Sequence, residues 1–307
     1  MPGTRSVSKV ERVPTTQSKP RSAEGRRAPA QAASGAAPLP VLRPGLPQRP
    51  EGRRSGGEFT APATQNASAF ALLLAAHGER RAGTDNEGAL DLAAALAKRA
   101  AANAVAVGFL KGTPSIADAV QQLSGYDLLV YPLFLADGYF TRKLLPRQLE
   151  EAGAYGRGRA ICLLPPLGID PALAELALAE ANTVAASQGW PAHRTNLVLL
   201  AHGSSNNPAS RLATEQMAGT LAARNIFARV RVAFLEELPS LSDAVASLSE
   251  PVVVVGLFAG EGMHGGDDAP RLIAQIGRSD VVPAGNIGGF AGLPDVIADT
   301  IRRRWKG

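Results

Sequence analysis

The sequence predicts an α/β protein with two tandem units, each built on a parallel sheet of about four strands, behind a disordered N-terminal tail. From Phe70 onward, short apolar runs alternate with stretches that have helical period. The runs are apolar along their whole length, which is typical of parallel strands that helices cover on both faces. The same sequence blocks also occur twice in the same order, which indicates a tandem duplication.

Four apolar runs are expected to form the sheet of the first unit. The third run shows no alternation of polar and apolar residues, so neither face of this sheet is expected to contact water. The expected strands are FALLLAA (70–76), AVAVGFL (104–110), DLLVYPLFL (127–135) and ICLLPPL (161–167).

Helices are expected between these strands. Residues 87–101 place apolar side chains at helical spacing. The Ser-X-X-Asp sequence at Ser115 favours a helix start, because the two side chains can cap the first turn reciprocally. Another helix is expected to end near Ala152, and Pro171 opens a long helix to about Ser187.

The second unit repeats this order at an offset of 125 or 124 residues. The matching blocks are FLKGTPSIADAV (109–120) with FLEELPSLSDAV (234–245), His77 with His202, and LFLADGYFTRKLLPRQL (133–149) with LFAGEGMHGGDDAPRLI (257–273). We therefore expect three domains: a Pro- and Arg-rich tail at 1–67, a first repeat at 68–190 and a second repeat at 191–307.

The tail accounts for the positive charge of the chain. Residues 1–60 carry 11 Lys and Arg against 4 Asp and Glu, and the remaining residues carry 21 against 23. The net charge of +5 is therefore no argument that the globular part binds nucleic acid. The tail has almost no large apolar residues, so burial cannot offset the entropy cost of ordering it. An Arg-rich transit peptide is an alternative to a dispensable tail.

Composition excludes several classes of protein. Cys162 is the only cysteine, which excludes a disulfide framework and a Cys-rich zinc site. No apolar run approaches the roughly 20 residues of a membrane span, and the N-terminus has no compact apolar segment typical of a signal peptide. We expect a soluble cytoplasmic protein without a membrane partner.

Three potential metal ligands of the second unit each follow a predicted strand. They are His202, Glu236 and His264. Because ligands bind at the carboxyl ends of strands in open parallel sheets, these side chains are expected at one edge. Two imidazoles and a carboxylate suit Co²⁺, Fe²⁺, Ni²⁺ or Zn²⁺, and three protein ligands leave a position open for substrate. The same groups can also accept protons from a bound organic molecule.

The first unit has departed from this pattern. His77 matches His202, but Lys111 stands in the place of Glu236 and Phe140 in the place of His264. The first unit therefore cannot build the same metal site. It has gained positive charge instead, which suits an anionic substrate.

Single residues also have other interpretations, of which the first is disfavoured by the sequence. A strand followed by His-Gly also occurs in histidine phosphatases, but their phosphorylated histidine follows an arginine, and here Ala76 and Ala201 hold that place. His193 lies in a polar connection and receives no role. Asp267 and Asp268 can simply begin a helix, where negative charge is favourable.

The blocks AHGSS (201–205), AFLEELPSLSDAV (233–245) and LFAGEGMHGGDDAP (257–270) resemble the three signature blocks of the CbiX/SirB family, which are sirohydrochlorin cobaltochelatases and ferrochelatases of class II. The resemblance spans residues 68 to 305 as two repeats. It implies two flavodoxin-like lobes with a tetrapyrrole cleft between them, and insertion of Co²⁺ or Fe²⁺ without ATP or another organic cofactor. Ni²⁺ is a third candidate metal.

The resemblance also implies roles for residues of both repeats. His202, Glu236 and His264 correspond to the metal ligands of the family, and His202 is the expected acceptor of the pyrrole protons. Sirohydrochlorin carries eight carboxylates, so cations of the first repeat are expected to hold it. The candidates are Arg142, Lys143 and Arg147, with Lys111 as a further one. The alternative is a carrier of metal or tetrapyrrole that derives from a chelatase and does not catalyse insertion.

Overall fold

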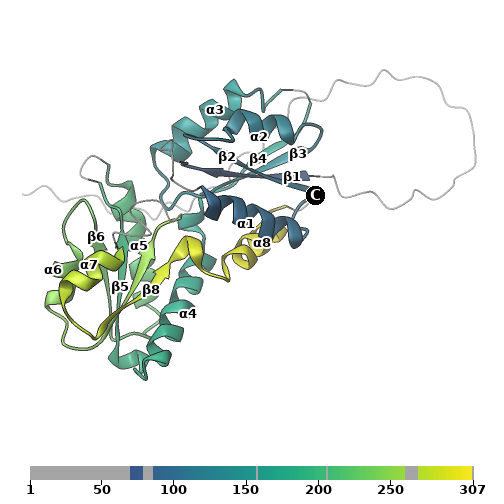
Figure 1. The fold of residues 1–307 in the computed structure, drawn as a ribbon. Helices are drawn as coiled ribbons and strands as arrows, with labels where there is room; N and C mark the ends of the chain where they lie inside the picture. Colours follow the sequence, from purple (N-terminus) through teal and green to yellow (C-terminus); the bar gives the residue numbers. More distant parts are fainter. Residues whose placement is uncertain (1–69, 79–85, 157, 205–206, 260–268, 306–307) are drawn as a thin grey trace, which may run out of the picture. The chain divides into compact units, whose positions relative to one another are not determined.

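The computed structural model describes residues 70–78, 86–156, 158–204, 207–259 and 269–305 (Figure 1). Two parallel sheets of four strands each occupy these residues. The predicted tail at 1–67 lies outside them, as do His264, Asp267 and Asp268. The predicted α/β class with two parallel-sheet lobes is confirmed.

The first sheet has the strand order β2-β1-β3-β4, with every pairing parallel. The strands are β1 (Phe70–Ala76), β2 (Ala104–Phe109), β3 (Asp127–Pro132) and β4 (Ile161–Leu163). The helical elements are α1 (Glu87–Lys98), α2 (Ile116–Gln122), the π-helix η1 (Phe140–Leu144), α3 (Leu145–Glu151), the 3₁₀ turn η2 (Leu167–Ile169) and α4 (Pro171–Ser187).

The second sheet has the order β6-β5-β7-β8 and is again wholly parallel. Its strands are β5 (Asn196–Ala201), β6 (Arg229–Phe234), β7 (Val252–Leu257) and β8 (Val281–Asn286). Its helical elements are η3 (Ala192–Arg194), α5 (Ala209–Ala222), α6 (Leu241–Ala246), α7 (Ala269–Ile276), η5 (Ile287–Gly289) and α8 (Leu293–Arg304). Counted within each sheet, both orders are 2-1-3-4, which is the start of the flavodoxin-like order.

Apolar side chains on both faces of each sheet form the core. On β1, Ala71 and Leu73 pack in one cluster with residues of α2 and α3, and Leu72 and Leu74 pack in another with residues of α1. Figure 1 shows α2 and α3 on one side of the first sheet and α1 on the other. All four side chains are fully buried, which explains why these strands have no polar alternation.

Three predicted strands end earlier than expected, and the run at 104–110 does so by one residue, at Phe109. The run at 161–167 forms a strand only at Ile161–Leu163, because Pro165 and Pro166 have no N–H group to donate to a ladder. The run at 127–135 pairs only as far as Pro132. The predicted helix at 87–101 likewise ends at Lys98, and Ala100 adopts a positive φ of 49°. These corrections concern only the ends of elements, and they leave the order and pairing of the strands as they are.

The two units share local contacts as well as topology. The Lys111 amide donates to the His77 carbonyl at 2.8 Å, and the Glu236 amide donates to the His202 carbonyl at 3.0 Å. Ser115 caps α2 in a capping box with Asp118, as the sequence predicts, and the equivalent Ser240 and Asp243 cap α6 in the same way. These matched bonds support the inference that the chain arose by duplication.

Helices α1 and α5 align at the same offset. Buried side chains occupy equivalent positions in the two helices: Leu92 corresponds to Met217, Ala93 to Ala218 and Leu96 to Leu221, each 125 residues apart. Positions on these two helices can therefore be compared one by one.

Ion pairs join the last helix of each repeat to the other repeat. Arg99, just after α1, pairs with Asp295 of α8 at 2.6 Å, and Arg224, just after α5, pairs with Glu175 of α4. Arg99 and Arg224 are themselves 125 residues apart, so the duplication extends to these contacts. Among the helices of the described residues, none has the length and apolarity needed to span a membrane.

Candidate metal centre

His202 and Glu236 meet at the carboxyl edge of the second sheet. His202 directly follows the central strand β5, and Glu236 lies two residues beyond the end of the adjacent strand β6. His202 Nε2 and Glu236 Oε1 are 3.4 Å apart. The two side chains are 42% and 54% exposed, so a metal ion can reach both. The strand order reverses between β5 and β7, so His202 lies beside the point at which ligands bind in open α/β sheets.

Backbone hydrogen bonds hold together the two segments that carry these side chains. The Glu236 amide donates to the His202 carbonyl, and the Leu235 amide donates to the Ala201 carbonyl at 3.0 Å. Gly203 has φ of 74°, a left-handed conformation that favours glycine. It turns the chain away from the sheet immediately after His202. The sequence therefore places an imidazole and a carboxylate at adjoining strand ends through short, hydrogen-bonded segments.

Glu237, the neighbour of Glu236, has a different environment. One of its carboxylate oxygens accepts hydrogen bonds from Arg211 Nε at 3.1 Å and Nη2 at 2.7 Å, and the other accepts from the Ser204 amide at 3.0 Å. Burial opposes its ionisation, but the hydrogen bonds from Arg211 and Ser204 outweigh it and lower the pKa of Glu237. With its oxygens engaged by these donors, Glu237 is the poorer metal ligand of the two glutamates.

The third predicted ligand, His264, lies outside the described residues. Within the ranges that the structure describes, no three His, Cys, Asp or Glu side chains come together as a metal site. The structure thus brings together two of the three predicted ligands, His202 and Glu236, and the position of His264 stays a prediction. The segment that carries it begins after β7, which pairs with β5, so its sequence position suits the same edge.

The same edge of the first sheet carries an aromatic contact in place of the metal ligands. His77 follows β1, as His202 follows β5, and its ring lies 4.6 Å from the Phe140 ring in an edge-to-face arrangement. Lys111 is exposed at the position that matches Glu236. Neither Phe140 nor Lys111 is a metal ligand, so the first repeat lacks the carboxylate and the second imidazole.

The three cations predicted to bind substrate lie on η1 and α3 of the first repeat, and all are exposed. Arg142 pairs with Asp137 at 2.7 Å, and Arg147 pairs with Glu151 at 3.1 Å. Lys143 lies beside Arg142 and forms no ion pair among the described residues. A negatively charged ligand must therefore compete with a carboxylate for each arginine but not for Lys143.

Sequence reasoning missed Arg211 and Glu237. The signal that could have found them is the internal comparison, since the matching positions of the first repeat hold Asn86 and Gly112. Both members of a charged pair are thus absent from the repeat that lacks Glu236 and His264. The comparison marks Arg211 and Glu237 as specific to the second repeat, but it does not separate Glu237 from Glu236, whose counterpart Lys111 differs as well.

Known proteins resemble this chain over both repeats. The CbiX family model matches residues 71–184 and 196–303. A probable sirohydrochlorin cobaltochelatase of Halobacterium salinarum is 24% identical over 221 residues, which cover 66% of this chain and 75% of that protein. The two stretches that the family model matches coincide with the two parallel sheets.

Solved structures show the same likeness. A CbiX described as the terminal enzyme for biosynthesis of siroheme in denitrifying bacteria is 31% identical, covers 77% of this chain and 100% of its own, and has a TM-score of 0.61. SirB from Bacillus subtilis with Fe³⁺ is 18% identical, covers 76% of this chain and 94% of its own, and has a TM-score of 0.65. At that identity, SirB shows a shared fold.

Proposed function

This chain belongs to the CbiX family, and from that premise we propose that it is a sirohydrochlorin chelatase, which inserts Co²⁺ or Fe²⁺ into the macrocycle. The observation that carries the proposal is the exposed pair of His202 and Glu236 at the ends of adjoining strands, 3.4 Å apart. An imidazole and a carboxylate suit either metal, and a site with few protein ligands can release the ion to another ligand. The metal ion is a substrate in this reaction.

The proposed ligand set is His202, Glu236 and His264, of which the last completes the site from the segment after β7. These side chains bind the ion before the macrocycle enters the site. Insertion of a divalent ion exchanges it for two pyrrole protons, so the site needs bases close to the ring nitrogens. His202 is the proposed acceptor, and Glu236 is a second base within reach of the same position.

The proposal assigns the carboxylates of the substrate to cations of the first repeat, namely Arg142, Lys143 and Arg147. Exposed charge pairs contribute little singly, so several of them must act together. Ni²⁺ is a further candidate metal, since His and Glu can hold it. We propose that the reaction uses no organic cofactor, and that the protein is cytoplasmic and binds neither nucleic acid nor a membrane.

Replacement of Lys143 by alanine is expected to weaken sirohydrochlorin binding by about fivefold, since an exposed charge pair is worth at most about 1 kcal/mol. Arg142→Ala should have a smaller effect, because Arg142 already pairs with Asp137. Titration of sirohydrochlorin into each variant, followed by its visible absorption, measures this. Co²⁺ affinity should stay unchanged in both variants. Equal sirohydrochlorin affinity in the native chain and the Arg142→Ala, Lys143→Ala double variant would remove these cations from the site.

The proposed function is tested by the rate of Co²⁺ and Fe²⁺ insertion into sirohydrochlorin, followed by the change in visible absorption. We expect the native chain to exceed the protein-free control and the His264→Ala variant to lose that advantage. A native rate equal to the control would overturn the proposal. If the native chain then still bound both metal and tetrapyrrole, it would be a carrier.

A further inference from the structure

The side chains of Arg211 and Glu237 connect three segments of the second repeat around the metal pair. Glu237 lies in the segment after β6, and Arg211 lies in the first turn of α5. Glu237 also accepts a hydrogen bond from the backbone of Ser204, in the segment after β5. These three segments include both His202 and Glu236, so the ion pair joins the two strand ends that carry the metal ligands.

Arg211 makes further contacts that hold it in one orientation. Its Nη2 also donates to the Leu238 carbonyl, and Nη1 donates to Glu215 at 3.3 Å. Its guanidinium carbon lies 4.7 Å from the centre of the Phe234 ring, the last residue of β6. A planar guanidinium that is fixed on several sides restricts the carboxylate it binds.

Glu237 in turn packs against the residue after His202. A Cβ atom at Gly203 would lie 2.8 Å from Glu237 Cγ and 2.9 Å from Phe234 Cβ. The Glu237 side chain is only 15% exposed, against 54% for Glu236. The two adjacent glutamates therefore point into different surroundings, one toward the backbone beside His202 and the other toward the imidazole itself.

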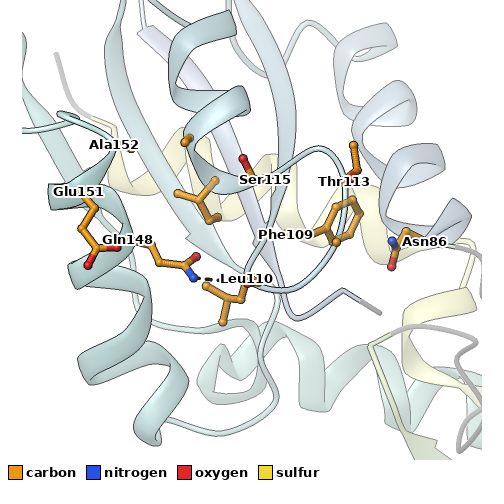
Figure 2. A pocket seen from close by; sticks show the side chains of 11 residues that line it. Asn86, Phe109, Leu110, Thr113, Ser115, Gln148, Glu151 and Ala152 are labelled. Carbon is orange, nitrogen blue, oxygen red and sulfur yellow. Dashed lines mark hydrogen bonds between the residues drawn. The ribbon is translucent and has the colours of Figure 1, made fainter. Parts of the chain in front are cut away.

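The first repeat lacks this ion pair together with the metal ligands. The positions that match Arg211 and Glu237 are Asn86 and Gly112, neither of which carries a charge. Both line a pocket of about 780 Å³ with Phe109, the counterpart of Phe234. Figure 2 shows this pocket, with Asn86 beside Phe109 on one side and Gln148 donating to Leu110 on the other. The ion pair is thus present in the repeat that keeps Glu236 and His264 and absent from the repeat that has lost both.

We propose that Arg211 and Glu237 are positioning residues, whose ion pair holds His202 and Glu236 in the arrangement that binds the metal substrate. The inference rests on the proposed function of this site. Residues that orient metal ligands affect metal affinity without touching the ion, because a ligand that must be ordered on binding gives up part of the binding free energy. Glu237 acts on the backbone at Ser204, and Arg211 fixes Glu237.

The test compares Co²⁺ affinity and the visible absorption spectrum of bound Co²⁺ in Glu237→Gln, Arg211→Met and the double variant. We expect Co²⁺ to bind about 10-fold to 100-fold more weakly in each single variant, with an altered spectrum, as is typical when a partner of a metal ligand is removed. The double variant should bind no more weakly than either single variant, because both remove the same ion pair. Arg211→Lys and Glu237→Asp, which keep both charges, should recover part of the affinity.

The matched control is the ion pair of Arg278 and Asp280, which lies in the same repeat just before β8, at the opposite edge of the sheet. Its 2.8 Å contact and partial exposure resemble those of Arg211 and Glu237. Asp280→Asn should lower thermal stability without changing Co²⁺ affinity. If Glu237→Gln lowers only thermal stability and leaves Co²⁺ affinity and spectrum as in the native chain, the pair serves folding and the inference is wrong.

This outcome is distinct from failure of the proposed function. Co²⁺ affinity is measured without tetrapyrrole, so it reports on the ion pair whether or not the native chain accelerates insertion. A native chain that inserts metal, with Glu237→Gln, Arg211→Met and the double variant all unchanged in Co²⁺ affinity, would refute the inference alone.

Discussion

Replacement of His202 by alanine is expected to lower both Co²⁺ affinity and the rate of Co²⁺ insertion by about 100-fold or more. The estimate follows from metal sites in general, where loss of a residue that merely orients a ligand already costs about 10-fold to 100-fold. His202 is a proposed ligand itself, and it is also the proposed acceptor of pyrrole protons. Equilibrium dialysis against Co²⁺ and the absorption assay with sirohydrochlorin measure the two losses separately.

The duplication supplies a matched control for this variant. His77 follows β1 as His202 follows β5, and its carbonyl accepts a hydrogen bond from the Lys111 amide as the His202 carbonyl does from the Glu236 amide. The same substitution there removes an imidazole from the same structural position, but from a repeat with Lys111 and Phe140 in place of the other ligands. His77→Ala should leave Co²⁺ affinity unchanged. Equal losses in the two variants would contradict a single metal site in the second repeat.

The sequence was sufficient to predict the two sheets, because burial on both faces leaves a direct mark on the strands. Runs such as FALLLAA and NLVLLA can only be covered on both sides, and the repeated blocks fixed their order. Strand ends were predicted less well. Pro165 and Pro166 end β4 early because they lack an amide donor, although their run is as apolar as a strand.

The candidate site was predictable to the level of residue type and strand end, but not of side-chain partner. Two adjacent glutamates follow β6, and Glu236 was chosen by its place after the predicted strand, a choice that the family resemblance then supported. The structure shows a physical difference between them, since Glu237 is engaged by Arg211, 26 residues earlier in the chain. Such a contact depends on how α5 returns over the sheet, which no local pattern records. The pairing of Arg142 with Asp137 was missed for a related reason, because charge alone does not tell which cations already have a partner.

A second metal site should appear in the first repeat when its lost ligands are restored. The double variant Lys111→Glu, Phe140→His returns a carboxylate and an imidazole to the positions that match Glu236 and His264. His77 is already present, and its ring lies 4.6 Å from that of Phe140, so a histidine there would stand close to it. With the two imidazoles and one carboxylate that suit this metal, the variant should bind about two Co²⁺ ions per chain, against about one for the native chain. Equilibrium dialysis gives this stoichiometry directly.

His77→Ala in the same background provides the control, since it should return the stoichiometry to the native value. A double variant that binds no more Co²⁺ than the native chain would show that the first repeat has lost more than two side chains.

The restored site is also expected to differ from the native site in its affinity for Co²⁺. Asn86 and Gly112 provide no ion pair to fix the ligands, so the restored site should bind Co²⁺ more weakly than the native one. Two sites with the same ligand types and unequal affinity would then separate the contribution of the ligands from that of the residues that hold them.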